Sequence, residues 1–196
     1  MWQPVLMING YLISVLGLAM LIPAAVDMLE TGRNWSLFVT SSIVSLFIGL
    51  SLFLGNRTKI EKITLQQGYL LTAVSWVSLT LLATLPFILS DVTPGFADAL
   101  FEAMSGLSTT GATVITDLEV LPDSILLWRS MLNGLGGVGI VIFAVALLPF
   151  LGIGGMQIFQ RENSDLNDKF MPKFNYIAKR IMAVYFILVP LCAGCL

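Results

Sequence analysis

FADALFEAMSGLSTTGATV, residues 96–114, joins an apolar half to a small, hydroxyl-rich half. Apolar side chains recur through the first half, at Phe96, Ala97, Leu100, Phe101 and Met104. This spacing predicts a short helix with one apolar face. The second half is centred on a glycine and carries no charge. The segment therefore raises the question of why an apolar chain becomes polar here without becoming an ordinary solvated loop.

The composition places most of the chain in lipid. Of its 196 residues, 57% are hydrophobic and 11% are charged, whereas a soluble domain carries about 25% charged residues. The net charge of −2 gives no basic footprint for nucleic acid. The absence of histidine excludes a Ser-His-Asp triad and any imidazole metal site. No paired catalytic groups lie within the apolar runs, so the sequence predicts a protein that is not an enzyme.

Four apolar runs are long enough to cross a bilayer, which requires about 20 residues. They span residues 4–26, 36–54, 68–90 and 124–151. The first is too long for the apolar region of a signal peptide and is expected to be a retained span. A fifth run, residues 181–196, would reach only about 24 Å of the ~30 Å hydrocarbon core. We expect it to be the beginning of a further span.

Basic residues lie mainly in two of the connections between these runs. Eight of the 10 Lys and Arg residues fall there: Arg57, Lys59, Lys62, Arg161, Lys169, Lys173, Lys179 and Arg180. If the spans alternate in direction, both connections lie on one side of the membrane. The positive-inside rule then places them, and the N-terminus, in the cytoplasm.

The connection between residues 91 and 123 contains the opening segment and lies on the outer side. Thr93 and Pro94 predict a helix start, with threonine as the cap and proline in the first turn. A helix from Pro94 to Leu107 would be about 21 Å long, too short to span and too apolar to lie in water. We expect it to enter the membrane and return. Asp98 and Glu102 would add an acidic vestibule.

The return leg, residues 108–114, has the features of a cation selectivity filter. Glycine can adopt positive φ, so that successive carbonyl oxygens face one axis and replace the water shell of an ion. Threonine hydroxyls add ligands or satisfy the local backbone. The partly negative C-terminal end of the short helix favours a cation. Two alternatives stay open at this point: a loop that only plugs a helix bundle, and an extracellular loop.

Three segments together resemble a known family. They are Pro86-Phe87 at the end of the third run, the opening segment, and LLWRSMLNGLGGVGIVIFAVALLPFLGIGGMQIF at residues 126–159. They resemble the Trk/Ktr/HKT superfamily of potassium transporters, and within it the bacterial TrkH/TrkG branch. The resemblance covers essentially the whole chain but less than half of a typical family member.

The resemblance implies an all-α membrane protein. Two N-terminal transmembrane helices (residues 1–62) would precede one repeat of helix, re-entrant pore helix, filter and helix (63–155). A cytoplasmic linker (156–177) would then lead to the start of a second, truncated repeat (178–196).

The resemblance also implies the site residues. Thr109, Thr110 and Gly111 would turn their main-chain oxygens to the ion, with Ser108 and Ala112 as possible neighbours of the filter. Glycine at position 111 favours K⁺ over Na⁺. Two residues outside the filter are expected to support the pore, Glu102 and Arg129. A simpler interpretation makes the adjacent Trp128 an anchor at the membrane interface and pairs Arg129 with a nearby acid such as Glu102 or Asp123.

The implied function is that of a membrane subunit of a potassium uptake system, with K⁺ as the transported ion and no covalent cofactor. An intact member would be a homodimer in the bacterial inner membrane, regulated by a cytoplasmic RCK-type nucleotide-binding subunit. Membrane lipid is expected as a partner and nucleic acid is not. Because a filter is a ring and this chain supplies one of four segments, three interpretations follow: the front of a longer protein or an inactive fragment of it, a short subunit that assembles its own ring, or a non-conducting membrane scaffold.

Overall fold

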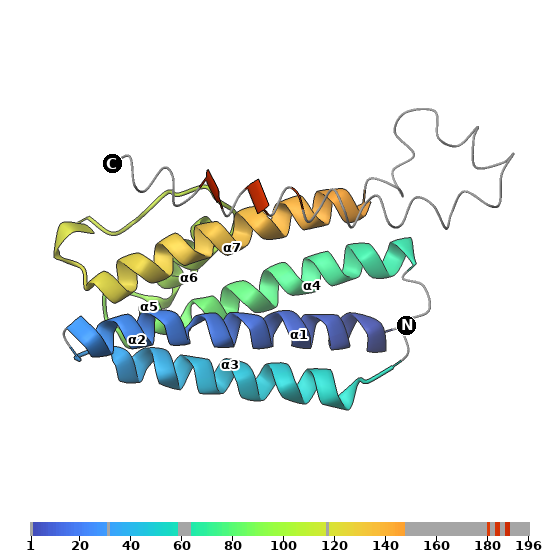
Figure 1. The fold of residues 1–196 in the computed structure, drawn as a ribbon, viewed down its shortest axis with the longest axis horizontal. Helices are drawn as coiled ribbons and strands as arrows, with labels where there is room; N and C mark the ends of the chain where they lie inside the picture. Colours follow the sequence, from blue (N-terminus) through green and yellow to red (C-terminus); the bar gives the residue numbers. More distant parts are fainter. Residues whose placement is uncertain are drawn as a thin grey trace, which may run out of the picture. The chain divides into compact units, whose positions relative to one another are not determined.

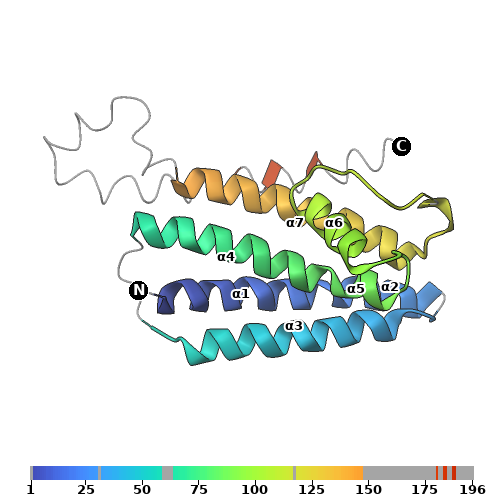
Figure 2. The same ribbon diagram turned by 180° about the vertical axis from the view of Figure 1, so that it is seen from behind.

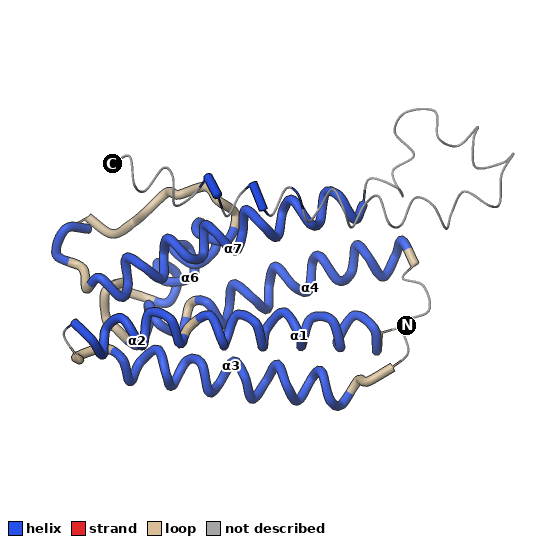
Figure 3. Tube along the Cα trace, in the orientation of Figure 1, coloured by secondary structure: helices blue, strands red, loops and turns tan. Residues whose placement is uncertain are grey.

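The computed structural model of the chain describes residues 2–30, 32–58, 64–116 and 118–147, together with residues 180, 183, 184, 187 and 188. These described residues form helices and no strands (Figure 3). They divide into two compact units, residues 1–135 and 136–196. In the second unit the described residues are the end of the last long helix and five residues that are also helical. The expected linker and most of the expected second repeat lie outside the described residues.

The first expected span is a pair of helices, α1 (Gln3–Ala19) and α2 (Leu21–Glu30). Together they cover 28 residues and are long and apolar enough to cross a membrane. The interruption at Met20 follows from Pro23, which has no N–H to donate to the carbonyl of Ala19 and whose ring crowds that carbonyl. The run therefore begins where the sequence predicts, but it is interrupted and continues four residues further.

The second expected span is confirmed as α3 (Trp35–Gly55), which packs along α1. The two helices approach closely because glycines face each other. A methyl group added to Gly49 would lie 2.8 Å from the main-chain oxygen of Gly10. Ser42 also donates a 2.7 Å hydrogen bond to the carbonyl of Gly17. Small residues and buried hydroxyls are the usual contacts between helices in lipid.

The third expected span comprises α4 (Leu65–Ala83) and α5 (Leu85–Leu89). A capping box starts α4, since Thr64 and Gln67 exchange side-chain to main-chain hydrogen bonds. The chain breaks at Thr84 because Pro86 cannot donate a helical hydrogen bond. The amide of Phe87, the helical donor to Ala83, bonds to the carbonyl of Thr84 at 3.1 Å, and the carbonyl of Ala83 accepts a 3.2 Å hydrogen bond from the indole of Trp128. This run is also long and apolar enough to cross a membrane.

The helix of the opening segment is α6 (Phe96–Leu107), about 18 Å long. It starts two residues later than Pro94. The predicted threonine cap is wrong, because Gly95 occupies the cap position and the hydroxyl of Thr93 is buried with no hydrogen-bond partner among the described residues. The physical reason is that a residue before proline is pushed to extended backbone, and Gly95 continues that extended path at φ −161°.

A 3₁₀ turn, η1 (Leu118–Val120), leads to α7 (Asp123–Leu147). The start of α7 agrees with the fourth expected span, whose end lies outside the described residues. Trp128 is not an interfacial anchor as the sequence suggested. It is fully buried and makes an edge-to-face contact with Phe38 at 6.4 Å between ring centroids. Aromatic pairs of this geometry stabilise a core beyond the area that they bury.

The core of the first unit is formed by buried side chains from the end of α1, from α2, and from the facing parts of α3 to α7, and it includes Trp128. The start of α1, the end of α3 and the start of α4 lie at one end of this unit (Figures 1 and 2). The α2, α5 and α6 helices lie at the other end. Large apolar side chains are exposed along α3, among them Ile43, Phe47 and Leu54, as expected for a surface that faces lipid.

Candidate functional site

The C-terminal end of α6 closes in a turn that starts the return leg. Thr109 donates to the carbonyl of Gly106 at 2.9 Å, and Thr110 donates to that of Ser105 at 3.0 Å. This pair of bonds is the Schellman arrangement, which needs a left-handed residue directly after the helix cap. That residue is Thr109, with φ 58°.

Threonine is poorly suited to this conformation. A β-branched residue at positive φ is an outlier and costs about 1–3 kcal/mol. Two main-chain hydrogen bonds offset this with about 0.5–1.5 kcal/mol each. The strain at Thr109 and the bonds that maintain it are therefore of similar size.

Backbone handedness alternates along the residues that follow α6. Thr109 and Gly111 have positive φ, at 58° and 72°, whereas Thr110 and Ala112 lie on the negative side. Alternation of this kind turns successive carbonyls toward a common side, in place of the opposite directions of a regular strand. In the part of the chain that the structure describes, no donor is hydrogen-bonded to the main-chain oxygens of Thr109, Thr110 or Gly111. All three residues are exposed.

Ser105, on the buried side of α6, shapes the turn through both of its oxygens. Its main-chain oxygen also accepts from Gly111 at 3.3 Å. Its hydroxyl donates to the carbonyl of Ala112 at 2.6 Å. The Ala112 oxygen is therefore engaged within the protein, unlike the oxygens of residues 109–111. Of the two possible neighbours of the filter, Ser108 and Ala112, Ala112 has its main-chain oxygen bonded to Ser105 of α6.

Glu102 attaches the next residues to α6. Its side chain is fully buried. One oxygen, Oε1, accepts from the hydroxyl of Thr113 at 2.5 Å and from the amide of Val114 at 2.7 Å. Because both partners lie just beyond residues 109–112, Glu102 determines where the return leg runs beside α6.

Arg129 of α7 neutralises this carboxylate. Its Nε lies 3.0 Å from Oε2 of Glu102, and its side chain is 17% exposed. The N–H does not point at the oxygen closely enough for a hydrogen bond, so the contact is an ion pair maintained by charge. Removing one member of a buried pair leaves an uncompensated charge, at about 3–5 kcal/mol. The expected acidic vestibule is wrong in one respect, because Glu102 presents no charge to solvent.

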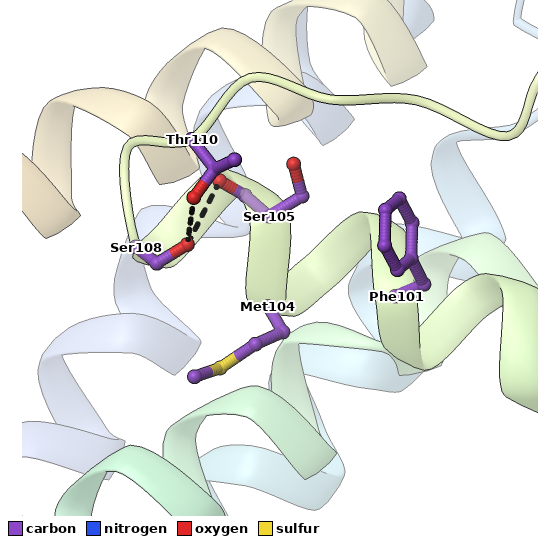
Figure 4. A pocket seen from close by; sticks show the side chains of 5 residues that line it. All are labelled: Phe101, Met104, Ser105, Ser108 and Thr110. Carbon is purple, nitrogen blue, oxygen red and sulfur yellow. Dashed lines mark hydrogen bonds between the residues drawn. The ribbon is translucent and has the colours of Figure 1, made fainter.

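An open pocket of about 200 Å³ lies beside the end of α6. Its lining combines Phe101 and Met104 with the polar side chains of Ser105, Ser108 and Thr110 (Figure 4). The hydroxyls of Ser108 and Thr110 lie 2.8 Å apart. The left-handed turn at Thr109 brings these two side chains together, because they flank the residue at which the chain reverses.

The structure thus brings Glu102 and Arg129 together, and it places Ser108 through Ala112 in one turn after α6. Sequence reasoning missed Ser105, Thr113 and the role of Trp128. Ser105 had a usable signal, since it lies three residues after Glu102 and therefore on a neighbouring part of the same helix face. Thr113 and Trp128 had none, because their partners depend on how the chain returns. Among the described residues no cluster of three or more metal-binding side chains occurs.

Comparison with known proteins gives close relatives over most of the chain. The chain is 38% identical over 192 residues to the Trk system potassium uptake protein TrkH of Halomonas elongata, covering 96% of this chain and 40% of that protein. It is 37% identical over 190 residues to TrkH of Escherichia coli K12, covering 95% and 39%. The chain spans about two fifths of the length of these curated relatives. Their names are those of transport proteins and not of enzymes.

A solved structure agrees with the fold. The crystal structure of the potassium transporter TrkH from Vibrio parahaemolyticus matches with a TM-score of 0.80 and 34% identity. The match covers 95% of this chain and 37% of that one. Among the described residues, three helical runs are able to cross a bilayer, α1 with α2, α3, and α4 with α5. Together with these runs, the relatives identify an integral membrane protein. The profile of the TrkH family, described as cation transport protein, matches residues 35–196. The resemblance found in the sequence is therefore confirmed, and the chain belongs to the TrkH family of cation transport proteins.

Proposed function

We propose that the chain provides one filter segment of a membrane protein that takes up K⁺, and that the ion passes the main-chain oxygens of Thr109, Thr110 and Gly111. One observation carries the proposal. Three successive carbonyls of alternating handedness, with no donor among the described residues, follow a short helix. Carbonyl oxygens in such a row replace the hydration shell of a cation.

The surroundings of this row favour a cation over an anion. The carbonyl end of α6 points toward the turn, and its partial negative charge attracts positive charge. The hydroxyls of Ser108 and Thr110 add neutral oxygens on the pocket side. Ala112 marks the end of the row, since its oxygen is taken by Ser105. The names of the relatives, which are potassium uptake proteins, favour K⁺ as the ion.

Glu102 and Arg129 support the row without touching the ion in this proposal. The carboxylate positions Thr113 and Val114. Arg129 places an opposite charge 3.0 Å from that buried carboxylate. Since the ion then sees main-chain dipoles and no full charge, it can leave the filter as readily as it enters.

The larger architecture is part of the same proposal. Residues 63–155 would form a helix, re-entrant pore helix, filter and helix repeat after a two-span extension at 1–62, with a second repeat starting at 178. The N-terminus would lie in the cytoplasm and the protein in a bacterial inner membrane. The whole protein would be a homodimer regulated by an RCK-type nucleotide-binding subunit.

Uptake of ⁸⁶Rb⁺, a K⁺ analogue, tests the proposal in proteoliposomes. One preparation contains the 196-residue chain. A second contains a chimera in which this chain replaces the matching segment of the Vibrio parahaemolyticus relative. We expect the chimera to take up ⁸⁶Rb⁺ in preference to ²²Na⁺. A folded and inserted chimera without uptake contradicts the proposal.

Uptake by the preparation that contains only the 196-residue chain distinguishes two forms of the same function. Uptake by the chain alone would identify a small subunit that assembles its own ring. A folded chain without uptake, beside a conducting chimera, would identify one segment of a longer filter.

A further inference from the structure

Two residues of the described chain other than glycine have positive φ, Asp91 at 51° and Thr109 at 58°. Both directly follow the cap residue of a helix, α5 and α6 respectively. Aspartate tolerates this conformation because its short polar side chain can bond to the nearby backbone. Threonine does not, because its branched Cβ crowds the carbonyl oxygen. The strained position therefore coincides with the proposed ion path, and the tolerated one lies outside it.

The side chain of Thr109 offers no local compensation for the strain. Its hydroxyl makes no hydrogen bond among the described residues, and the residue is exposed. The hydroxyl pair in the pocket belongs to its two neighbours, Ser108 and Thr110. The left-handed state is instead maintained by two main-chain bonds from the residues that follow it, from Thr110 and from Gly111 to the oxygen of Ser105. Their combined strength is similar to the strain they oppose.

We propose that Thr109 is a conformational switch at the start of the filter segment. In its left-handed state the Thr109 carbonyl lies in the row with Thr110 and Gly111. In the extended state that threonine prefers, the peptide between Thr109 and Thr110 rotates, the bonds from Thr110 and Gly111 to Ser105 open, and this carbonyl leaves the row. Glycine at the same position would remove the preference for the open state.

The switch deepens the proposed function. The two backbone states of Thr109 do not depend on that function, and only the role of the ion rests on it. A cation coordinated by the row binds the left-handed state better than the open one, and therefore shifts the population toward it. The shift is limited by the difference in affinity between the two states. Occupancy of the filter and the conformation of Thr109 are then linked, so that an empty filter opens more often than an occupied one.

Amide hydrogen exchange of Thr110 reports the switch directly, since this N–H donates to Ser105 only in the left-handed state. The full chain, labelled with ¹⁵N-threonine, is measured by NMR in detergent micelles. We expect Thr109→Gly to slow this exchange roughly tenfold, the effect of about 1.4 kcal/mol of relieved strain. Thr109→Val retains the branched Cβ without the hydroxyl and should stay within about threefold of the parent.

Asp91→Gly is the matched control, because it relieves a left-handed residue outside the filter. It should leave the exchange of Thr110 unchanged. Exchange that is as fast in Thr109→Gly as in the parent overturns the switch, and so does an equal slowing by Thr109→Val, since the hydroxyl would then be responsible. Circular dichroism of each variant verifies that the helices are retained.

The role of the ion is tested in the chimera with the Vibrio parahaemolyticus relative, which supplies the rest of the filter, with and without Thr109→Gly, by replacing Na⁺ with an equal concentration of K⁺. We expect K⁺ to slow the Thr110 exchange in the parent, and to have a smaller effect in Thr109→Gly, which is already closed. A slowing by Thr109→Gly without any effect of K⁺ supports the switch and counts against the proposed K⁺ filter. An effect of K⁺ without a slowing by Thr109→Gly supports the K⁺ filter and counts against the switch.

Discussion

At the scale of the residue, the return leg depends on side chains that face away from it. Glu102 and Ser105 lie on the buried side of α6, and each binds a main-chain group of the segment 112–114. Gly111 contributes conformation alone, because a methyl group there would meet nothing within 4 Å while φ is 72°. The open carbonyls are therefore presented by a backbone whose course is determined by residues behind it.

The first prediction concerns Glu102. Glu102→Gln keeps an acceptor for Val114 but leaves the partly exposed guanidinium of Arg129 without its ion-pair partner. The free energy of unfolding should fall by about 1–3 kcal/mol, less than for a fully buried pair because water reaches the guanidinium. Denaturant titration of the purified chain in detergent measures it.

A double variant provides the control for this pair. Glu102→Gln with Arg129→Gln should lose less stability than the sum of the two single variants, because the buried charge is gone. Strict additivity would contradict a direct interaction.

The second prediction concerns Gly111. Gly111→Ser places an L-residue at positive φ, which costs about 1–2 kcal/mol, and it should displace the carbonyl from the row. In the chimera we expect the ⁸⁶Rb⁺ to ²²Na⁺ uptake ratio to fall toward one. Gly55→Ser is the matched control, since Gly55 also has open space but no positive φ. An unchanged ratio in Gly111→Ser removes this residue from the filter.

At the scale of the element, Pro23 and Pro86 interrupt two of the apolar runs. The break near Pro86 forms a contact between helices. The carbonyl released near Pro86 accepts the indole N–H of Trp128, so the break in the third run is connected to α7. The contact between α1 and α3 has another basis, the absence of side chains at Gly10 and Gly49. Helix breaks and close approaches thus position α6 and α7 within the bundle.

The third prediction tests this close approach. A methyl group at Gly49 would lie 2.7 Å from the amide nitrogen of Ser14 and 2.8 Å from the oxygen of Gly10. Main chain cannot move aside easily, so Gly49→Ala should lower stability by about 1–3 kcal/mol or more. Gly55→Ala, at the open end of the same helix, should change it by less than about 0.5 kcal/mol. Thermal unfolding of both variants in detergent provides the comparison, and equal melting temperatures would contradict the tight crossing.

At the scale of the whole first unit, Asp27 joins α2 to the starts of α3 and α7. Its carboxylate accepts from the amide of Asn34 at 2.7 Å, at the start of α3, and from the hydroxyl of Ser124 at 3.0 Å, at the start of α7. The residue is 2% exposed. Since Arg129 lies five residues beyond Ser124 on α7, α2 contacts the same helix that pairs with Glu102.

The fourth prediction follows from that position. Asp27→Asn weakens hydrogen bonds to a buried charge, each of which contributes about 1.5–3 kcal/mol. We expect the melting temperature of the chain to fall and the exchange of the Asn34 amide to accelerate by tenfold or more. Glu30→Gln removes an exposed carboxylate of the same helix and should leave both unchanged. A variant of Asp27 with parental exchange at Asn34 would show that the carboxylate does not maintain this junction.

Local composition by itself determined the membrane class, the positions of the apolar runs, the short helix before the hydroxyl-rich turn, and the family. These depend on side chains near one another in the chain, and residues 36–54 and the start of α7 agree with the structure for that reason. The filter assignment to Thr109, Thr110 and Gly111 stays a prediction.

Only the tertiary structure decided which groups satisfy one another inside the protein. Trp128 and Ala83 are 45 residues apart, and Ser124 and Asp27 are 97 apart. No local sequence pattern predicts such a pair, because a buried donor or acceptor bonds to the group that the packing of distant helices places next to it. For the same reason the burial of Trp128 was missed, whereas the two-residue error at the start of α6 came from a local effect, the extended backbone around Pro94 and Gly95.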